Sequence, residues 1–433
     1  MNGTTGRGSL EHPLDLPAIE EICVSALSTL DLRGKRVLVL IPDHTRHAPI
    51  GIFFRTLHRI LGASVKCLDY LVATGTHRAM EADRLYRHIG ITPEEHRSTY
   101  TNVRLLAHEH DNPAALRNIG TIPASEIRTL TGGLFAQDVP VSINRAVLEY
   151  DHVLIVSPVV PHEAMGFAGG NKYFFPGVGG LDIIETFHWL AAVITNPAVN
   201  GVKDTPTRRV IDRAAMFLEV PRTCFAFAVD DRGLLSCLFA GSPEEAWSRA
   251  ADYSAKLHVR YLRSPARCVL GVTPDIYEEI WVGGKAMYKL EPVVADGGEL
   301  IIYGPQIREI SFVHGDAFRR IGYHVRDYFL GQWEKFRSEP KLILAHSTNV
   351  RGVGTFDGGI ERPRIGVTLA TGIPEELCSA VNLGYRDPRS IDLDAWRRNP
   401  GPGDLVVENA GQDLYRLQNR ELSSAIVENQ KGT

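Results

Sequence analysis

Short runs of β-branched and aliphatic residues alternate with longer stretches of helical periodicity from one end of the chain to the other. Buried strands are expected over residues 36–41, 65–72 and 150–156, and a helix over residues 53–61 follows the first of them. Parallel strands need a crossover connection, which is usually a helix, so this alternation predicts an α/β fold with mostly parallel sheets.

A second series of the same kind begins near residue 266. We expect strands over residues 268–272, 299–303, 341–345 and 365–370, and a helix over residues 276–290. The run Asn-Pro-Gly-Pro-Gly that starts at Asn399 is turn chemistry and marks the end of this series. The pattern therefore predicts two α/β domains, an N-terminal one over residues 1–262 and a smaller one over residues 266–398.

Each of the three N-terminal strands ends in a polar or glycine-rich loop. These loops cover residues 42–46 (Pro-Asp-His-Thr-Arg), 73–77 (Ala-Thr-Gly-Thr-His) and 158–180. Ligands of open parallel sheets bind outside the carboxyl ends of the strands. We therefore expect the three loops to share one site.

The third loop is dense in glycine around Lys172, with six glycines among residues 166–180. It matches neither the phosphate-binding loop of nucleotide triphosphatases nor the fingerprint of dinucleotide dehydrogenases. A tight connection that needs positive φ would explain the glycines equally well. A lysine among apolar and glycine residues would be desolvated, however, which favours a covalent anchor or nucleophile.

Three histidines, His77, His162 and His188, flank Lys172 in the sequence. A single histidine in such a loop would most often be structural. A group of them near strand ends favours general acid or base chemistry, or the binding of nickel, zinc or copper. His88 and the run that starts at His108 lack zinc-ligand spacing, and we expect them on the solvated surface.

Two further cations are candidates for binding an anionic substrate. Arg46 presents a fork of donors suited to a carboxylate or phosphate, although an ion pair with Asp43 is the structural alternative. Lys285 follows a Gly-Gly pair that is expected to kink its helix.

Composition excludes several classes of function. The 433 residues carry 47 Lys and Arg against 51 Asp and Glu, a net charge of −4 that argues against nucleic-acid binding. Hydrophobic residues make up 44% and charged residues 23%, as in ordinary soluble proteins. The sequence contains neither an apolar run long enough to span a bilayer nor an N-terminal secretory pattern, so we expect a cytoplasmic protein.

At this point the motifs resemble the nickel-pincer lactate racemase family. The resemblance rests on D-x-T-R at residues 43–46, A-T-G-x-H-R at 73–78, P-H-E…G-G-x-K…P-G at 161–177, and the later His188. Lys285 and residues 408–411 are similar too, so it covers nearly the whole chain. His47, Phe167-Ala168 and Asn171 differ from the family pattern near the pocket, which leaves the substrate open.

The resemblance implies a fold, a cofactor and a set of roles. The active site would lie in an interdomain cleft, and the tail, residues 400–433, would pack back on the first domain. The cofactor would be a nickel-pincer nucleotide, a pyridinium mononucleotide with two sulfur-containing arms, joined to Lys172, with His188 as the protein ligand of nickel. The other implied cofactor-binding residues are Asp43, Thr45, Thr74, Gly75, Gly169 and Gly170.

The implied reaction is inversion at C2 of a small 2-hydroxy acid by hydride transfer, with Lys172 essential as the tether. His77 and His162 would be the acid and base, and Arg46, helped by Lys285, would bind the carboxylate. Cofactor-synthesis proteins are expected as partners in maturation. Two alternatives stay open: a lysine-dependent carbonyl or phosphate-ester enzyme without nickel, and a non-catalytic protein that binds nickel or a mononucleotide.

Overall fold

The structure, a computed structural model, describes residues 3–46, 48–77 and 80–418, which form two compact units. Unit 1 takes its described residues from Met1–Val160, Phe167–Phe187 and Lys203–Leu257. Unit 2 takes them from Pro161–Gly166, His188–Val202 and His258–Thr433. The chain therefore passes between the units several times, whereas the sequence pattern predicted one uninterrupted N-terminal domain.

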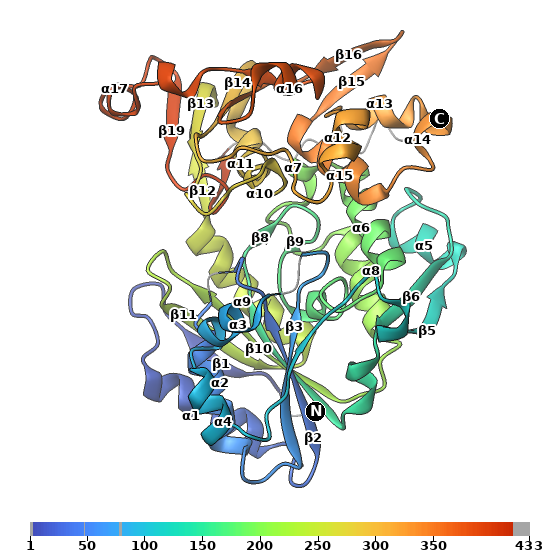
Figure 1. Ribbon diagram of the computed structural model, residues 1–433, viewed down its shortest axis with the longest axis vertical. Helices are drawn as coiled ribbons and strands as arrows, with labels where there is room; N and C mark the ends of the chain where they lie inside the picture. The colour runs from blue at the N-terminus through green and yellow to red at the C-terminus, as the bar shows by residue number, and fades with distance from the viewer. Residues whose placement is uncertain (1–2, 47, 78–79, 419–433) are drawn as a thin grey trace. The chain divides into compact units, whose positions relative to one another are not determined.

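Unit 1 is built on a seven-stranded sheet with the order β1-β11-β10-β7-β2-β3-β4 (Figure 1). The five strands from β10 to β4 are parallel, and β11 and β1 are antiparallel at one edge. Their bounds are β1 Thr5–Gly8, β2 Arg36–Pro42, β3 Cys67–Ala73, β4 Leu105–Ala107, β7 His152–Pro158, β10 Arg222–Val229 and β11 Leu235–Gly241.

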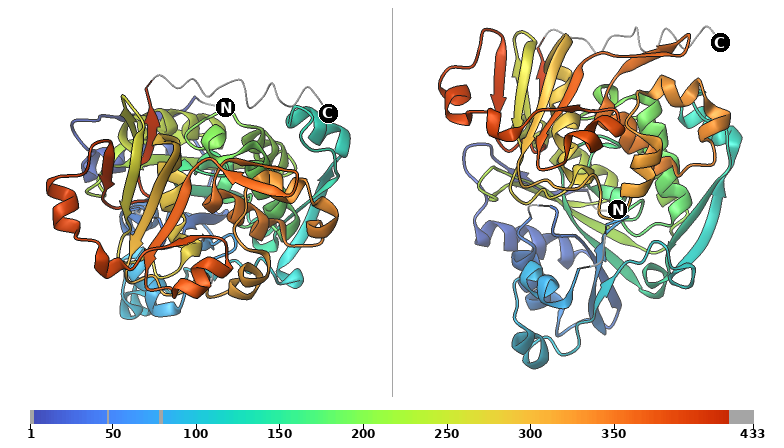
Figure 2. Two further views of the ribbon diagram at one scale, coloured as in Figure 1. Left: turned by 90° about the horizontal axis from the view of Figure 1, so that it is seen from above. Right: turned by 45° about the horizontal axis from the view of Figure 1, so that its top comes forward.

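Two helices, α1 (Leu16–Ser28) and α2 (Ile50–Leu61), cover one face of this sheet (Figure 2). The side chain of Asp15 caps the first turn of α1 by accepting from the N–H of Ala18 at 3.0 Å. Alternate residues of β2, β3 and β10 join the helices in one hydrophobic core, and the rings of Phe53 and Phe227 stack at 4.9 Å. All residues of β2 after Arg36 are buried, as expected for a central strand covered on both faces.

Unit 2 contains a five-stranded sheet, all parallel, with the order β18-β17-β14-β13-β19. The strands are β13 Ala266–Val272, β14 Val294–Gly304, β17 Gly366–Thr371, β18 Gly384–Tyr385 and β19 Asp404–Val407. The prediction of an α/β protein with mostly parallel sheets is therefore confirmed.

The remaining elements are the other helices and the strands that belong to neither of these two sheets. In chain order they are α3 Ala82–Ile89, α4 Pro93–Ser98, β5 Leu116–Ile122, α5 Ala124–Leu130, β6 Val139–Asn144, β8 Pro161–His162, β9 Gly166–Phe167, α6 Leu181–Ile194, α7 Asn196–Val199, α8 Pro206–Ala215, α9 Pro243–His258, β12 Val259–Leu262, α10 Ile280–Gly283, α11 Lys285–Leu290, α12 Gly315–Ile321, α13 Arg326–Leu330, α14 Trp333–Phe336, α15 Lys341–Arg351, β15 Gly354–Asp357, β16 Ile360–Pro363, α16 Glu375–Ala380, α17 Leu393–Arg398 and β20 Leu414–Leu417. None of the helices in the described ranges is long and apolar enough to cross a membrane.

Two expectations for the second series were wrong. Residues 341–345 begin the helix α15 and do not form a strand. Every residue of α15 from Leu342 to Val350 is buried, so its short apolar run shows no one-sided helical pattern that would separate it from a buried strand. The helix expected over residues 276–290 starts later and is two short helices, α10 and α11, that meet at Gly284.

The structure groups the described part of the C-terminal tail with unit 2. β19 extends the second sheet by pairing with β13, and β20 pairs with β12. Within unit 2, Arg416 also donates to the carbonyl of Pro197, and Asp413 pairs with Arg260.

Candidate active site

The loops that follow β2, β3 and β7 meet at one small hollow in unit 1. The ends of β2 and β3, Pro42 and Ala73, are register partners, and β7 lies on the other side of β2. The hollow has a volume of about 40 Å³, and the strand ends and loops supply its lining residues: Pro42, Asp43, Arg46, Ala73, Thr74, Gly75, His77, Lys172 and Tyr173. The three loops therefore do lie together, as the sequence predicted.

Asp43 and His77 form a hydrogen-bonded pair at this hollow. Oδ2 of Asp43 lies 2.6 Å from Nδ1 of His77, while Oδ1 accepts from the backbone N–H (3.1 Å) and hydroxyl (2.6 Å) of Thr45. The side chain of Asp43 is 5% exposed and that of His77 35%. Both carboxylate oxygens are thus used, one to fix the loop and one to orient the imidazole.

The pair fixes the ionisation of Asp43 and orients the ring of His77. Burial by itself would raise the pKa of the Asp43 carboxyl, but the charge and hydrogen bonds of His77 and Thr45 outweigh it and hold the pKa well below its usual value. An ionised carboxylate only accepts, so Nδ1 of His77 carries a hydrogen, and in the neutral form of the ring Nε2 then has the lone pair. His77 is therefore prepared to take a proton at Nε2.

Sequence reasoning assigned Asp43 to cofactor binding and His77 to catalysis without linking them. They are 34 residues apart, on loops after different strands, so no local spacing reveals the pair. The register of β2 against β3 brings them together.

Lys172 lies in a 3₁₀ turn, Gly170–Tyr173, that follows a left-handed glycine backbone. The φ angles of Gly169 and Gly170 are 98° and 62°. The N–H of Gly170 donates to the hydroxyl of Ser157 at 2.9 Å, so the protein itself uses that donor. The tight connection considered at the outset thus accounts for both glycines, and its result is to place Lys172 at the hollow.

Arg208 of α8 forms hydrogen bonds with the backbone of the same loop. Its guanidinium donates to the carbonyl oxygens of Gly169 (3.2 Å) and Phe167, and it lies 3.9 Å from the ring centroid of Trp247. The indole N–H of Trp247 donates to the carbonyl of Ala168 at 2.9 Å. These contacts satisfy three successive carbonyls that the glycine-rich backbone would otherwise leave unpaired in the interior.

Asn171, a position that departs from the family pattern, belongs to a second buried contact. Its amide donates to Asp212 at 3.0 Å and to Glu244 at 2.7 Å. Burial raises the pKa of Asp212, and the Asn171 hydrogen bond and the Arg208 charge partly offset this. These hydrogen bonds could not be predicted from the sequence, because Asp212, Glu244 and Asn171 come from α8, α9 and the loop.

Gly169→Ala is expected to destabilise unit 1 by about 1–3 kcal/mol, because an added Cβ would lie 2.7 Å from the Ser157 hydroxyl oxygen at a positive φ. Gly133→Ala is the matched control: its φ is 94°, but a Cβ there meets nothing within 4 Å. Denaturant unfolding of both variants separates backbone strain from the collision. Equal losses in the two variants would show that the packing against Ser157 contributes nothing.

Of the histidines expected on the surface, His88 is half-buried and His108 is buried, so that expectation was wrong for His108. His108 is 2% exposed; its Nε2 lies 3.0 Å from the carbonyl of Gly179, and its own carbonyl accepts from the hydroxyl of Thr74 at 3.3 Å. Burial lowers the pKa of His108 to about 4, so it is neutral at pH 7. The Nε2 of His88 lies 2.8 Å from the carbonyl of Pro42, next to Asp43.

Tyr173 was not predicted as a site residue, yet it lines the hollow. Its side chain is 7% exposed, and burial raises the pKa of its phenol well above the usual value. Gly75 joins the second loop to the third by donating its N–H to the carbonyl of Gly177 at 2.9 Å. These contacts fix the position of the β3 loop relative to the loop that carries Lys172.

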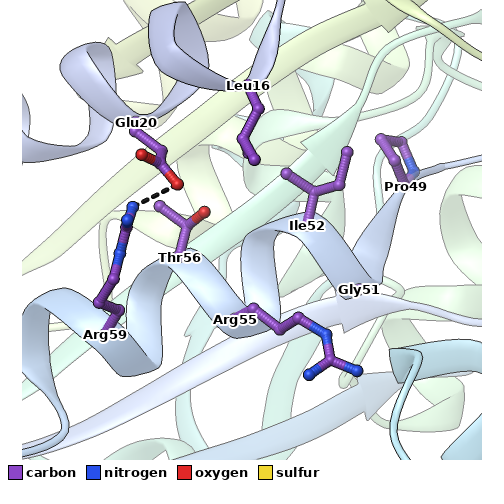
Figure 3. Close-up of a pocket in the computed structure, with 8 residues that line it drawn as sticks. All are labelled: Leu16, Glu20, Pro49, Gly51, Ile52, Arg55, Thr56 and Arg59. Carbon is purple, nitrogen blue, oxygen red and sulfur yellow. Dashed lines mark ion pairs between the residues drawn. The ribbon is translucent and has the colours of Figure 1, made fainter.

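A larger hollow of about 520 Å³ lies elsewhere in unit 1, between α1 and α2 (Figure 3). Glu20 and Arg59 point toward one another across it and form an ion pair. Arg55 donates to the carbonyl of Gly90 at 2.5 Å. None of the residues predicted as functional lines this hollow, and its charged groups already have protein partners.

Three other predicted site residues belong to unit 2. His162 is buried, and its Nδ1 accepts from the N–H of Ala164 at 3.1 Å and lies 3.5 Å from Oε2 of Glu163. His188 lies on α6. Lys285 begins α11 directly after the Gly283-Gly284 break, and its Nζ is 5.6 Å from the ring centroid of Tyr277.

Residue 47, a departure from the family pattern, and residue 78, the last of the A-T-G-x-H-R motif, lie outside the described residues. Within residues 3–46, 48–77 and 80–418, no group of three or more His, Cys, Asp or Glu side chains is arranged to hold a metal ion.

The chain is similar in sequence to known proteins. Residues 9–200 match the family model described as the lactate racemase N-terminal domain. A lactate racemase of Thermoanaerobacterium thermosaccharolyticum is 26% identical over 309 residues, which are 68% of this chain and 63% of that protein, so the match spans less than two thirds of its length.

Two solved structures are similar over most of the chain. A protein from Thermotoga maritima has 33% identity and a TM-score of 0.84, covering 94% of this chain and 99% of its own. The lactate racemase apoprotein of T. thermosaccharolyticum has 20% identity and a TM-score of 0.68, with 92% of each chain covered, and supports the fold. Residues 9–200 therefore match the lactate racemase N-terminal domain family, and the strand-end motifs of that region lie at one hollow.

Proposed function

We propose that this protein is a racemase or epimerase that inverts C2 of a 2-hydroxy acid, with a nickel-pincer nucleotide as its cofactor. The observation that carries the proposal is the Asp43–His77 pair beside Arg46 and Lys172 at one hollow. A base, a carboxylate-binding cation and a primary amine are the groups that such a reaction needs from the protein.

The residues present fit this cofactor. Lys172 would hold it through its primary amine, on a loop that buried contacts from Arg208 and Trp247 keep in place. His188 would bind the metal, since imidazole is a suitable ligand for nickel. When bound, the cofactor supplies an acceptor for the C2 hydrogen and its electron pair.

His77 acts as the general base toward the substrate hydroxyl. Its Nε2 lone pair receives the hydroxyl proton, and the ionised Asp43 stabilises the imidazolium that results. The ring of His162 is oriented through Nδ1, which accepts from the Ala164 N–H and lies 3.5 Å from Oε2 of Glu163. We assign His162 to proton transfer on the opposite face of the substrate carbon, with Lys285 as a helper in carboxylate binding.

Arg46→Ala is expected to act through substrate binding and to raise KM by about 10- to 100-fold, the worth of a charge-assisted hydrogen bond. Arg55→Ala is the matched control, because Arg55 lines the other hollow and should leave KM unchanged. Steady-state kinetics measure both variants. An Arg46→Ala enzyme with native KM and lowered kcat would place this guanidinium in the chemical step instead.

Maturation by cofactor-synthesis proteins is part of the proposal. Protein co-expressed with such proteins and supplied with nickel should invert pure stereoisomers from a panel of lactate, larger aliphatic and aromatic 2-hydroxy acids, malate and sugar acids. Protein expressed without them should be inactive. Chiral chromatography measures the inversion, and failure of the nickel-loaded protein with every panel member would favour a binding protein over an enzyme.

A further inference from the structure

Unit 2 contains a small cavity with polar walls, lined by other residues than the hollow described above. Its volume is about 20 Å³, and its lining residues are Thr195, Asn196, Glu291, Arg326, Thr348, Asn349, Gly352, Val353 and Gly354. A cavity of about 10–15 Å³ or more can hold one water-sized sphere. The space therefore fits a single water molecule or a single small ion.

Four side-chain oxygens at this cavity have no hydrogen-bond partner among the described residues: Thr195 Oγ1, Glu291 Oε2, Thr348 Oγ1 and Asn349 Oδ1. Glu291 is 0% exposed and the other three residues are 4–6% exposed. Buried polar groups without a partner are uncommon in folded proteins. Four around one space indicate a missing occupant that binds oxygen.

Two helices end at this cavity. α6 ends at Ile194 and Thr195 follows it, while Thr348 and Asn349 lie in the last turn of α15, which ends at Arg351. The carboxyl end of a helix carries a partial negative charge. Both ends therefore favour a positive occupant.

The nearby arginines do not supply that positive charge to Oε2 of Glu291. Arg326 donates to Asp327 (2.8 Å) and to the carbonyl of Val193 (2.9 Å). Arg364 donates to Asp296 at 3.0 Å and lies 4.0 Å from the other carboxylate oxygen of Glu291, Oε1. Arg364 is thus shared between Asp296 and Glu291, so three carboxylates face two guanidiniums and one negative charge is left over.

A water molecule would complete the hydrogen bonds but leave that charge uncompensated next to two helix ends. Burial raises the pKa of Glu291, and Arg364, the Val353 N–H and the Asn196 side chain offset only part of this, so an ionised carboxylate is costly there. A cation compensates the charge and uses all four oxygens. The single carboxylate and three neutral oxygens match one positive charge better than two.

We propose that this cavity binds an alkali-metal cation, Na⁺ or K⁺, through Glu291, Thr195, Thr348 and Asn349. The cation joins the end of α6 to α15 and to the 3₁₀ helix Glu291–Val293. It also explains the backbone of Thr195, a non-glycine residue with a φ of 90°, because an ion ligand can hold such a strained residue. The proposal does not depend on the proposed function, although α6 carries His188.

The first test is thermal unfolding of the full-length protein in KCl, NaCl or choline chloride at equal ionic strength. One of the two alkali ions should raise Tm by about 3 °C over choline, as expected for an ion bound only by the folded state. Glu291→Gln should abolish that difference. Glu299→Gln is the matched control, since Glu299 bonds Thr368 and Arg386 on the second sheet and should keep the shift. Equal Tm values of the native protein in all three salts would overturn the proposal.

The second test does not require a variant that folds. Crystals of the protein grown in RbCl should show an anomalous-scattering peak in this cavity, because Rb⁺ replaces K⁺ at oxygen sites. Thr348→Val, which removes one oxygen and preserves side-chain shape, should weaken the peak. A cavity with an ordered water and no Rb⁺ signal, in protein whose Tm is no higher in NaCl than in choline chloride, would contradict the proposal. Neither Tm nor the anomalous peak depends on turnover. The cation proposal can therefore fail while the racemase proposal holds, and the reverse.

Discussion

Asp43→Asn is expected to slow turnover by about 10²- to 10⁴-fold while nickel and the cofactor stay bound. An amide can offer its N–H₂ group to Nδ1 of His77, which favours the tautomer with its hydrogen on Nε2 and removes the lone pair that takes the substrate proton. The loss should appear in kcat because the group acts on the reacting hydroxyl.

Asp69→Asn is the control for the loss of a buried carboxylate. Asp69 is 0% exposed on β3 and binds Arg104 and Tyr150, away from the hollow. That variant should unfold more easily and keep its turnover per folded molecule. If Asp43→Asn turned over at the native rate, Asp43 would not control His77.

Asp43→Asn is also expected to change how the free energy of unfolding varies with pH. The folded-state pKa of Asp43 is lowered, so its carboxylate contributes stability above the unfolded pKa of about 3.9, and this contribution is lost as pH falls toward the folded value. The difference in unfolding free energy between native protein and Asp43→Asn should therefore shrink between about pH 5 and the lowest pH at which the protein folds.

Lys172→Ala is expected to abolish both the covalent adduct and turnover. The amine is the only group proposed to attach the cofactor, and no other side chain at the hollow can replace it among its lining residues. Lys172→Arg keeps the positive charge but presents a guanidinium, so it should be inactive as well.

Peptide mapping and intact mass of fully active protein measure the adduct. Lys203→Ala is the matched control, because Lys203 pairs with Asp252 on the surface of the same unit and should keep the adduct and the rate. Full activity in protein whose Lys172 is unmodified would contradict the tether.

The sequence was most informative about where the site would be. Each buried strand of unit 1 and its loop could be recognised locally, and the rule that parallel strands share a carboxyl edge then brought residues 43–46, 73–77 and 172 together. The helix α15 was misassigned because its apolar run is buried on all sides. The interruption of unit 1 by residues 161–166 and 188–202 has no local signal, since it depends on long-range packing.

The residues that hold the glycine-rich loop in place could not be predicted from the sequence, for the same reason. Arg208, Trp247 and Asp212 are ordinary helix residues in sequence, and only the tertiary fold places them under the glycine-rich loop. His108 seemed a solvated residue in a charged run, yet its ring is buried against Gly179. Long-range hydrogen bonds of this kind carry no periodicity that a single sequence could reveal.

The central claim is tested most directly by incubating one pure stereoisomer of an accepted 2-hydroxy acid with nickel-loaded, matured protein in D₂O. Inversion is followed by chiral chromatography and the C2 position by NMR. The proposal predicts inversion with the original hydrogen largely retained at C2, because it leaves with its electron pair and returns without passing through water. Deuterium that appears at C2 in step with inversion would contradict it and indicate proton abstraction between two histidines.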